Sequence, residues 1–385
     1  MPFLPGRHSS CRQSHNRFVE TALAYALTYI SSLGLSKLGS ASITILADSD
    51  YYSHPALAGS SIPLTTERFV GFNVPLYEAH KTGLGSSAAL VTAFIAATLA
   101  HYVPKELMEV TSKDGRLRLH NLAQAAHCAA QGKVGSGFDV AAAVYGSCIY
   151  RRFSPSILGG IGDVGSAGFE GRLKSAVGDS DLPTKWDMEI DKPSAALPTG
   201  LRLLMCDVDC GSETVGMVKS VLAWKKEQPT EAKTLWAALQ KGNEALVDEL
   251  MILKSGSREV PLNLERLRSI ILTIRALVRE MSEKARVPIE PKVQTDLIDS
   301  CCKLDGVIGG IVPGAGGYDA ITLLVEDQVD VINDLVHHLE SYRMDADSSQ
   351  GPDIGNIRLL GVKQDDQGVK QEVPGTYSKW TRKRI

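Results

Sequence analysis

One stretch limits the possible folds and ligands of this chain more than any other. It is a tight glycine turn that leads directly into a helical pattern at residues 88–102. The first turn of a helix carries backbone N–H groups without internal partners, and the aligned peptide dipoles make that end positive. Glycine lets an anion approach the backbone closely, so the stretch predicts a site for a phosphorylated ligand. It consists of Lys81, Thr82, Gly83, Leu84, Gly85, Ser86, Ser87, Ala88, Ala89, Leu90 and Val91.

Two other interpretations of this turn remain open. Residues 83–88 also fit the loose dinucleotide-binding pattern G-x-G-x-x-A, which requires a buried strand before it and an acid about 20 residues later. Glu106 can serve as that acid, but Pro75 and Lys81 make a poor buried strand. The second interpretation is structural, with Ser86 capping the helix and the glycines forming a tight turn. The P-loop pattern G-x-x-x-x-G-K-[ST] is absent from the turn.

Two further glycine loops occur at residues 131–137 and 314–317. The first of them precedes an apolar helical pattern that has Asp139 at its start. Asp139 either caps that helix, where a carboxylate is favoured, or faces the first turn and organises a transferred phosphoryl group. The loop at 314–317 lies between two strand patterns, and a glycine-rich hairpin is its structural alternative. Three such loops in a chain without repeats favour one shared ligand site.

Composition excludes several classes of function. A chain of 385 residues is long enough for two domains. A net charge of −3 gives no electrostatic case for binding nucleic acid or an anionic membrane surface. The seven cysteines form no C-x-x-C pair, which favours free thiols in a reducing compartment. His337 and His338 are interpreted as an exposed helix face rather than as a metal-ligand pair.

The apolar patterning predicts helices and strands on both sides of a connector at 154–200, which indicates two α/β or α+β domains. Helices are expected at 17–33, 86–102, 119–131, 215–254, 262–283 and 327–342. Strands are expected at 42–47, 68–74, 186–190, 201–208, 304–312, 320–325 and 357–362. Residues 140–152 are expected to pass from helix to strand, and a polar tail is expected after 362.

The order of the motifs resembles the GHMP small-molecule kinases. The motifs are G-L-G-S-S-A-A at 83–89, G-S-G-F-D-V-A-A-A-x-Y-G at 135–146 and P-G-A-G-G-Y-D at 313–319. Further segments are similar to the phosphomevalonate kinases of the fungal type within that superfamily. They are H-N-L-A-Q at 120–124, Y-R-R-F at 150–153, G-S-E-T-V at 211–215 and I-E-P at 289–291. The resemblance extends from residue 16 into the C-terminal region.

The resemblance implies an α+β fold of two domains with the site in the cleft between them. The N-terminal domain, over 1–195, would be of the ribosomal-S5-like α/β type and incomplete at its start; the C-terminal domain, over 196–385, would be ferredoxin-like. It implies Mg²⁺- and ATP-dependent phosphorylation of mevalonate 5-phosphate to the 5-diphosphate, in isoprenoid and sterol synthesis.

The resemblance also implies roles for individual residues. Residues 81–91 would cradle the ATP phosphates, with Ser86 or Ser87 near Mg²⁺, and Asp139 would be the catalytic aspartate. Before the resemblance is considered, Ser212 and Thr214 are interpreted as a helix cap after the strand at 201–208. The residues that would bind the acceptor are Ser136, Gly137, Ser147, Arg151, Arg152, Ser212, Thr214, Gly314, Ala315, Gly316 and Gly317.

The chemistry of the acceptor refines the role of Asp139. The second pKa of a phosphate is near roughly 6, so the acceptor is already largely ionised at neutral pH. A strong general base is therefore unnecessary, and the difficulty is to bring two polyanions together. We expect Asp139 to organise Mg²⁺ or a lysine first, and to act as a base second.

Two departures from the family pattern affect these expectations. His127 and Cys128 stand where many relatives carry a magnesium-binding glutamate, so ligation is expected to rest on serine, Asp139 and ATP. Nothing in residues 1–40 matches the family's Pro-Gly-Lys loop, so the chain is expected to begin partway through the N-terminal domain.

Several alternatives therefore remain open. One is a weakly active or inactive ligand-binding remnant, another is a different GHMP small-molecule kinase, and the third is a nicotinamide-dependent oxidoreductase built on the first turn. Small molecules are the expected partners, with no nucleic acid and no membrane. The cytosol is the expected compartment.

Overall fold

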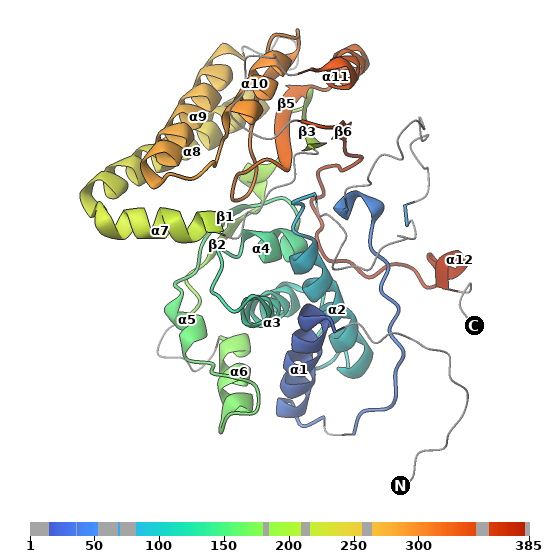
Figure 1. The fold of residues 1–385 in the computed structure, drawn as a ribbon. Coiled ribbons are helices and arrows are strands. Elements are labelled where there is room, and N and C mark those ends of the chain that lie inside the picture. The colour runs from blue at the N-terminus through green and yellow to red at the C-terminus, as the bar shows by residue number, and fades with distance from the viewer. Residues whose placement is uncertain are drawn as a thin grey trace.

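The computed structural model describes residues 15–35, 37–52, 68–69, 82–179, 185–208, 216–255, 264–343 and 354–381. Figure 1 shows two halves, one above the other: a lower N-terminal half dominated by helices and an upper C-terminal half built on a sheet. Each half has its own hydrophobic core, one formed by residues between 22 and 177 and another by residues between 204 and 339.

The N-terminal half packs its helices around α2, which spans Ser86–Tyr102. This helix is apolar on every side, so it is stable only when other elements surround it. Its side chains Ile95 and Leu99 have no exposed surface, and they share the core with the neighbouring helices. Those helices are α1 (Arg17–Ser32), α3 (Lys113–Gln131), α4 (Phe138–Tyr145) and α6 (Phe169–Gly178).

Helix ends in this half follow local capping rules. Asn16 precedes α1, and its side-chain oxygen accepts hydrogen bonds from the backbone N–H groups of Phe18 and Val19. Helix α3 begins after Ser112, whose hydroxyl accepts from the N–H of Gly115, and it ends at Gly132 in the left-handed conformation. The cap at Gly132 sets where the second glycine loop of this half begins.

A short antiparallel ladder lies between the two halves. Strand β1 (Ile149–Arg151) pairs with β2 (Glu189–Asp191), with Tyr150 opposite Ile190. The connection between them contains the short helix α5 (Ser156–Gly159) and α6, and η2 (Pro193–Ala195) follows β2. Figure 1 shows the ladder beside α4, at the junction with the C-terminal half.

The C-terminal half is a four-stranded antiparallel sheet in the order β4-β5-β3-β6, with helices on both faces. Its strands are β3 (Leu201–Val208), β4 (Val307–Ile311), β5 (Ala320–Glu326) and β6 (Ile357–Leu359). On β5 the side chains alternate: Leu323 packs toward α10 and α11, whereas Leu324 packs toward α8 and α9. The helices are α7 (Met217–Glu227), α8 (Pro229–Ser255), α9 (Glu265–Ala285), α10 (Lys292–Cys301) and α11 (Val329–Ser341).

The segment after β6 returns to the N-terminal half. The carbonyl of Asp365 accepts a hydrogen bond from the N–H of Ser147 at 2.7 Å, and the N–H of Val369 donates to the carbonyl of Val144 at 3.2 Å. Gly146 and Gly368 pack so closely that a Cβ on either would overlap backbone atoms of the other's segment. The sequence predicted only a polar tail here; in the structure this segment is bound to the N-terminal half by backbone hydrogen bonds, by Arg116 and Lys192, and by packing of Val369 against the core. The chain continues to α12 (Ser378–Thr381).

Most predicted elements are confirmed. The helices α1 and α2, the passage from α4 to β1, and the strands β3 and β5 begin and end within a few residues of the predicted bounds. The predicted loop at 154–200 contains helix α6, and helix α10 was not predicted. Glycines at 171 and 178 obscure the helical pattern of α6, whereas in α10 the helical spacing of Val293, Leu297 and Cys301 was an available signal.

The predicted strand at 42–47 is wrong. These residues run without a paired strand among the described residues, and the side chains of Ile43 and Ile45 are 45% and 48% exposed. The alternation of apolar and polar residues at 42–47 predicted a strand, but neither isoleucine is buried. The strand predicted at 68–74 lies mostly outside the described residues, and the domain bounds at 195/196 and the two domain types stay predictions. In the described part of the chain, no helix is both long and apolar enough to cross a bilayer.

Candidate active site

The first glycine turn has the backbone geometry of an anion site. Gly83 and Gly85 have φ angles of 73° and 71°, in the left-handed region that glycine adopts without strain. Gly85 is the N-cap of α2, and no side chain of the described residues caps that end of the helix. The first-turn N–H groups and the positive end of the helix are thus directed at whatever binds there. The interpretation in which Ser86 caps α2 is wrong, because the cap residue is Gly85.

The carboxylate of Asp139 lies beside this turn. Asp139 is in the first turn of α4, and a Cβ built on Gly85 would lie 3.4 Å from the Cβ of Asp139. Its Oδ1 accepts a hydrogen bond from the N–H of Val140 at 2.9 Å, which fixes the side chain at the helix end. The first two glycine loops therefore converge, with a partly exposed carboxylate between them.

His127, on α3, lies close to both loops. Its Nε2 lies 3.1 Å from the hydroxyl of Ser87, 3.9 Å from Oδ2 of Asp139 and 3.3 Å from Nε2 of Gln131. Burial lowers the pKa of His127, the charge of Asp139 opposes that shift, and Lys133 adds to it. The imidazole is therefore neutral at pH 7, so it can hydrogen-bond to Ser87 without neutralising the carboxylate of Asp139, which lies beyond hydrogen-bond distance.

The second loop admits only glycine at residue 137. Gly137 has a φ of 86°, and a Cβ there would lie 2.5 Å from Oε1 of Gln124 and 2.7 Å from the hydroxyl of Tyr150. Tyr150 donates to the carbonyl of Ser136 at 3.1 Å, and Arg152 donates to the carbonyl of Gly135 at 2.9 Å. Strand β1 thus braces the loop that carries Asp139.

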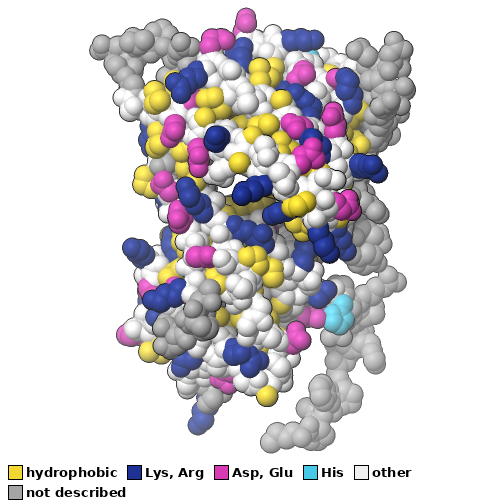
Figure 2. All heavy atoms as spheres, turned by 90° about the vertical axis from the view of Figure 1, so that its left-hand side faces the viewer, with side chains coloured by type: hydrophobic (Ala, Val, Ile, Leu, Met, Phe, Trp, Pro, Cys, Tyr) yellow, Lys and Arg dark blue, Asp and Glu magenta, His cyan; other side chains and the backbone are white. Residues whose placement is uncertain are grey.

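The predicted acceptor residues near β1 have different surroundings. Arg151 is 63% exposed and pairs with Glu189 at 3.2 Å, whereas Arg152 contacts loop carbonyls. Ser147 lies at the start of the β1 segment and is bound through its backbone to Asp365. Figure 2 looks onto the side where β1 and β2 lie in Figure 1 and shows Lys and Arg side chains gathered along a hollow between the two halves. This surface has the sign of charge that an anionic acceptor requires.

The third loop, at residues 314–317, is seated on the corner between α9 and α10. The N–H of Gly317 donates to the carbonyl of Ile289 at 2.9 Å. A Cβ on Gly316 would lie 2.4 Å from that same carbonyl oxygen, so the loop backbone lies directly against Ile289. Gln294 on α10 adds a hydrogen bond of 2.5 Å to the carbonyl of Tyr318. The position of Ile289 therefore sets the position of the loop.

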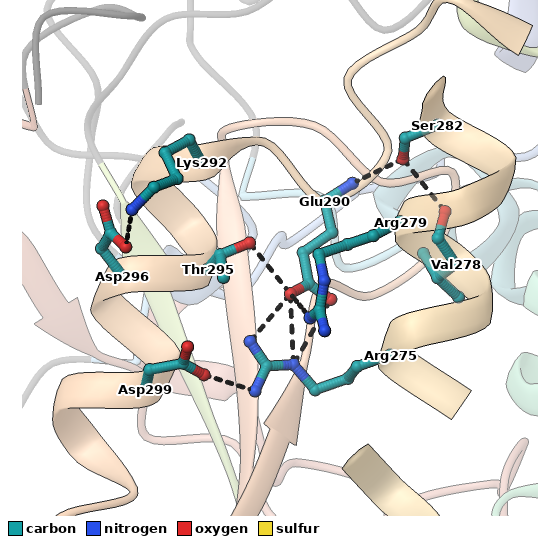
Figure 3. Close-up of polar contacts among 9 residues, drawn as sticks. All are labelled: Arg275, Val278, Arg279, Ser282, Glu290, Lys292, Thr295, Asp296 and Asp299. Atoms are coloured by element: carbon teal, nitrogen blue, oxygen red, sulfur yellow. Dashed lines mark hydrogen bonds and ion pairs between the residues drawn. The ribbon is translucent and has the colours of Figure 1, made fainter. Parts of the chain in front are cut away.

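A buried cluster of charges fixes that corner (Figure 3). The carboxylate of Glu290, whose side chain is 1% exposed, accepts from Arg275 at 2.8 Å, from Arg279 at 2.9 Å and from the hydroxyl of Thr295 at 3.1 Å. Arg275 also pairs with Asp299 at 2.6 Å. Two arginines and two carboxylates balance in charge, so the cluster can stay buried.

The third loop lies at the end of the sheet that approaches the N-terminal half. Ala320, which follows the loop, pairs with Asp207 on β3, and Asp207 lies 3.9 Å from Arg358. Arg358 in turn contacts Asp50, which belongs to the N-terminal half. Figure 1 shows this end of the sheet above α4.

Some predicted residues cannot be placed. Lys81, Ser212 and Thr214 lie outside the described residues. The other predicted members of the first loop, Thr82 to Val91, form the turn and the first part of α2. No group of His, Cys, Asp and Glu side chains suited to hold a metal ion occurs among the residues that the structure describes. A metal site here would thus depend on hydroxyls, one carboxylate and the ligand itself.

Sequence reasoning named His127, and Gln131 at the start of the second loop, without giving either a role in the site, and it missed Asp50 and Arg358. The spacing of His127 and Gln131, four residues apart on one face of α3, was an available signal. No local pattern pairs residue 50 with residue 358.

Comparison with known proteins agrees with this geometry. Residues 64–147 match the model of the GHMP kinases N terminal domain, a range that includes both converging loops. The chain is 53% identical to phosphomevalonate kinase erg8 of Aspergillus fumigatus, over 95% of this chain and 75% of that protein. It is 47% identical to phosphomevalonate kinase ERG8 of Gibberella zeae, over 95% of this chain and 78% of that protein.

A solved structure shows the same fold. The Lin0012 protein of Listeria innocua superimposes with a TM-score of 0.61 at 20% identity, covering 93% of this chain and 82% of that one. At that identity the likeness concerns the fold alone, whereas the identity to the fungal relatives extends over nearly the whole sequence. The chain therefore belongs to the phosphomevalonate kinase family of the GHMP kinases.

Proposed function

We propose that this chain transfers the γ-phosphoryl group of ATP to (R)-5-phosphomevalonate, giving ADP and 5-diphosphomevalonate in the mevalonate pathway to isoprenoids and sterols. The observation that carries this proposal is the convergence of an uncapped helix start with the carboxylate of Asp139. Family membership supplies the substrate class. In the transfer, the bond from the γ-phosphorus to the bridging oxygen of ADP breaks, and a bond to an oxygen of the acceptor phosphate forms.

The first glycine turn is the proposed site of the nucleotide phosphates. Its glycines leave the backbone accessible, and the N–H groups at the start of α2 can donate to phosphate oxygens. The hydroxyls of Ser86 and Ser87 add two donors. Such donors stabilise the charge that develops during transfer only if they are held in place beforehand, and the contact of Ser87 with His127 holds one of them.

The residues around Asp139 fit a magnesium ion. Mg²⁺ prefers oxygen ligands and usually takes one or two from protein, with the rest from phosphates and water. Ser86, Ser87 and Asp139 offer hydroxyl and carboxylate oxygens on the two converging loops. When bound, Mg²⁺ would neutralise part of the charge on the phosphates. A carboxylate beside a polyphosphate is repulsive without such a cation, which supports a role for Asp139 as an organiser of Mg²⁺ or a lysine.

The acceptor site is proposed at the junction of the two halves. Arg151, at the end of β1, and Arg152 after it supply positive charge, and the loop at 314–317 bounds the site from the C-terminal half. Ser136, Gly137 and Ser147, together with Ser212 and Thr214, complete the proposed set. Because the acceptor phosphate is already ionised, these groups need only position it in line with the γ-phosphate.

Steady-state assays with purified protein test the proposal. ADP formation is measured with MgATP and either 5-phosphomevalonate or mevalonate, and the product is identified by ³¹P NMR. We expect turnover with 5-phosphomevalonate and a new diphosphate signal. Turnover with mevalonate alone would instead show a different GHMP kinase, and binding of ATP without turnover would show an inactive remnant. The cytosol stays the predicted compartment, which imaging of a fluorescent fusion checks.

A further inference from the structure

The residue that opens the first glycine turn is anchored to a short helical turn, η1 (Ser49–Tyr51). Thr82 is fully buried, and its hydroxyl donates to the carbonyl of Asp50 at 2.7 Å. Its backbone N–H donates to the carbonyl of Tyr51 at 3.3 Å. A side-chain oxygen of Asp48 accepts from the N–H of Asp50, which stiffens η1 itself. A displacement of η1 would therefore also move Thr82 and the glycine turn that follows it.

The C-terminal half also binds η1. Arg358 on β6 donates to the carboxylate of Asp50 at 3.2 Å and to the carbonyl of Tyr52 at 3.3 Å. The N–H of Gly361 adds a hydrogen bond of 2.9 Å to the other carboxylate oxygen of Asp50. Figure 1 shows η1, drawn in blue, just below β6, although some three hundred residues separate them in the chain. The first glycine turn is thus fixed, through η1, against the C-terminal sheet.

The guanidinium of Arg358 also contacts the strand that leads to the proposed acceptor residues. Its Nη2 lies 3.9 Å from Oδ2 of Asp207, which is opposite Arg358 in the ladder between β3 and β6. Asp207 also pairs with Ala320 on β5, which follows the loop at 314–317. One planar group therefore contacts both the support of the first glycine turn and the strand beside the third loop, a geometry suited to the rigid fork of arginine.

We propose that Arg358 is a positioning residue for phosphoryl transfer, acting through Asp50 to set the first glycine turn relative to the acceptor-bearing end of the C-terminal sheet. The inference rests on the proposed function. Transfer between two polyanions requires the reacting oxygen and phosphorus to be held close and in line, and a misplacement of about 1 Å can lower the rate by about a hundredfold. Arg358 contacts Asp50, Tyr52 and Asp207, and a residue that acts through them is expected to affect the rate of transfer more than the binding of either substrate.

Steady-state kinetics of Arg358→Gln and Asp50→Asn test the inference against a matched control. Arg202→Gln is that control, because Arg202 lies on the same sheet, is 35% exposed compared with 32% for Arg358, and pairs with Asp327 within the C-terminal half. We expect Arg358→Gln to lower kcat by roughly ten- to a hundredfold, with smaller changes in either KM. Arg202→Gln is expected to stay within about twofold of the unsubstituted protein, as for an exposed pair.

A double variant separates positioning from a merely structural role. If Arg358 acts through Asp50, the loss in kcat for Asp50→Asn with Arg358→Gln equals that of the larger single variant. Arg358→Lys, which keeps the charge but not the fork, is expected to recover kcat only in part. Rates are normalised to the folded fraction measured by circular dichroism.

Two results would overturn the inference: a kcat for Arg358→Gln equal to that of Arg202→Gln, or multiplicative losses in the double variant. Absence of turnover in the unsubstituted protein would instead contradict the proposed function, so the two failures are distinguishable. If Arg358→Gln does not fold, Asp50→Asn alone compared with Arg202→Gln decides the question.

Discussion

The two halves of the molecule each place a glycine loop at their junction, but different kinds of contact hold the two loops. The loop at 82–87 starts a helix, and the groups in direct contact with it are neutral: the backbone carbonyls of η1 that bind Thr82, and the uncharged His127. The ion pair of Asp50 with Arg358 acts one step away, on η1. The loop at 314–317 joins two strands and is seated on Ile289, beside the buried charge cluster around Glu290. The first arrangement leaves N–H groups and a carboxylate available for chemistry, and the second mainly fixes a surface in place.

This difference assigns the chemical step to the N-terminal loops and the seating of the acceptor to the C-terminal loop. Neutral supports leave the local charge to Asp139 and the ligand, so that a cation and phosphates can dominate the site. A cluster with balanced charges adds no net charge beside the loop. It also holds the corner in place, because losing one member leaves its buried partner unpaired. The substitutions below are expected to separate the two roles.

Asp139→Asn is expected to produce the largest effect on the N-terminal side. The amide keeps the shape of the side chain but removes its negative charge, so kcat is expected to fall by roughly a hundred- to a thousandfold, as for other lost electrostatic contacts in active sites. Steady-state assays with MgATP and 5-phosphomevalonate measure this, with the exposed Asp163→Asn as control. Unchanged turnover would remove Asp139 from the mechanism.

Glu290→Gln is expected to act on stability rather than chemistry. It leaves the buried Arg275 and the half-buried Arg279 around a neutral amide, so the free energy of unfolding is expected to fall by about 3–5 kcal/mol. Thr295→Val removes one hydrogen bond from the same carboxylate and is expected to cost about 1 kcal/mol. Urea unfolding followed by circular dichroism measures both. Equal losses in the two variants would contradict the idea of a charge cluster that fixes the corner.

The pH dependence of stability is expected to come from the N-terminal core. Burial lowers the pKa of His120 from 6.5 to about 4, so the folded state holds this imidazole neutral while the unfolded state binds a proton below pH 6.5. Its contribution is complete above pH 6.5 and is lost as the pH falls toward 4, by about 3 kcal/mol in total. Urea unfolding at pH 7.5 and pH 5 measures the loss.

His120→Gln is expected to flatten that dependence, whereas His337→Gln, at an exposed position on α11, is expected to leave it unchanged. His127, whose pKa burial also lowers, shifts stability in the same direction and sets the residual slope. A steep slope that survives the loss of His120 would place the pH dependence elsewhere in the molecule.

Gly316→Ala and Gly314→Ala form a matched pair that tests the seat of the C-terminal loop. Both positions have positive φ, 85° and 66°, so each alanine is expected to cost about 1–2 kcal/mol in backbone strain. Only the Cβ at 316 would meet Ile289, at 2.4 Å from its carbonyl oxygen, whereas nothing lies within 4 Å of a Cβ at 314.

We therefore expect only Gly316→Ala to raise the KM for 5-phosphomevalonate, by about tenfold, which corresponds to about 1.4 kcal/mol. The KM for ATP is expected to stay unchanged in both variants. A larger rise in the KM for ATP would place the nucleotide, rather than the acceptor, at this loop.

Local sequence rules predicted the parts of the molecule that local physics determines. The helical patterns at 17–33 and 86–102 predicted α1 and α2, and the glycines at 83 and 85 indicated a tight turn before α2; the structure confirms each. The approach of Asp139 to the first loop was one of two open interpretations, and the structure favours it over a residue that only caps α4.

Contacts between distant residues were not predictable in this way. The Glu290 cluster draws on residues 275, 279, 295 and 299, and no spacing along the chain marks such a set as one buried network. The return of the segment around Asp365 to the N-terminal half depends mainly on hydrogen bonds to backbone carbonyls, which leave no apolar pattern beyond the single Val369. The prediction of a strand at 42–47 is wrong for the opposite reason: the apolar alternation is present, but no strand among the described residues pairs with it.

A crystal structure with Mg²⁺, a non-hydrolysable ATP analogue and 5-phosphomevalonate tests the division of roles most directly. We predict that the γ-phosphate lies within hydrogen-bonding distance of the N–H groups at the start of α2, with the metal ion between it and Asp139. We predict that the acceptor phosphate contacts the 314–317 loop. A nucleotide whose phosphates lie away from the start of α2, or a metal ion that Asp139 does not approach, would contradict the account.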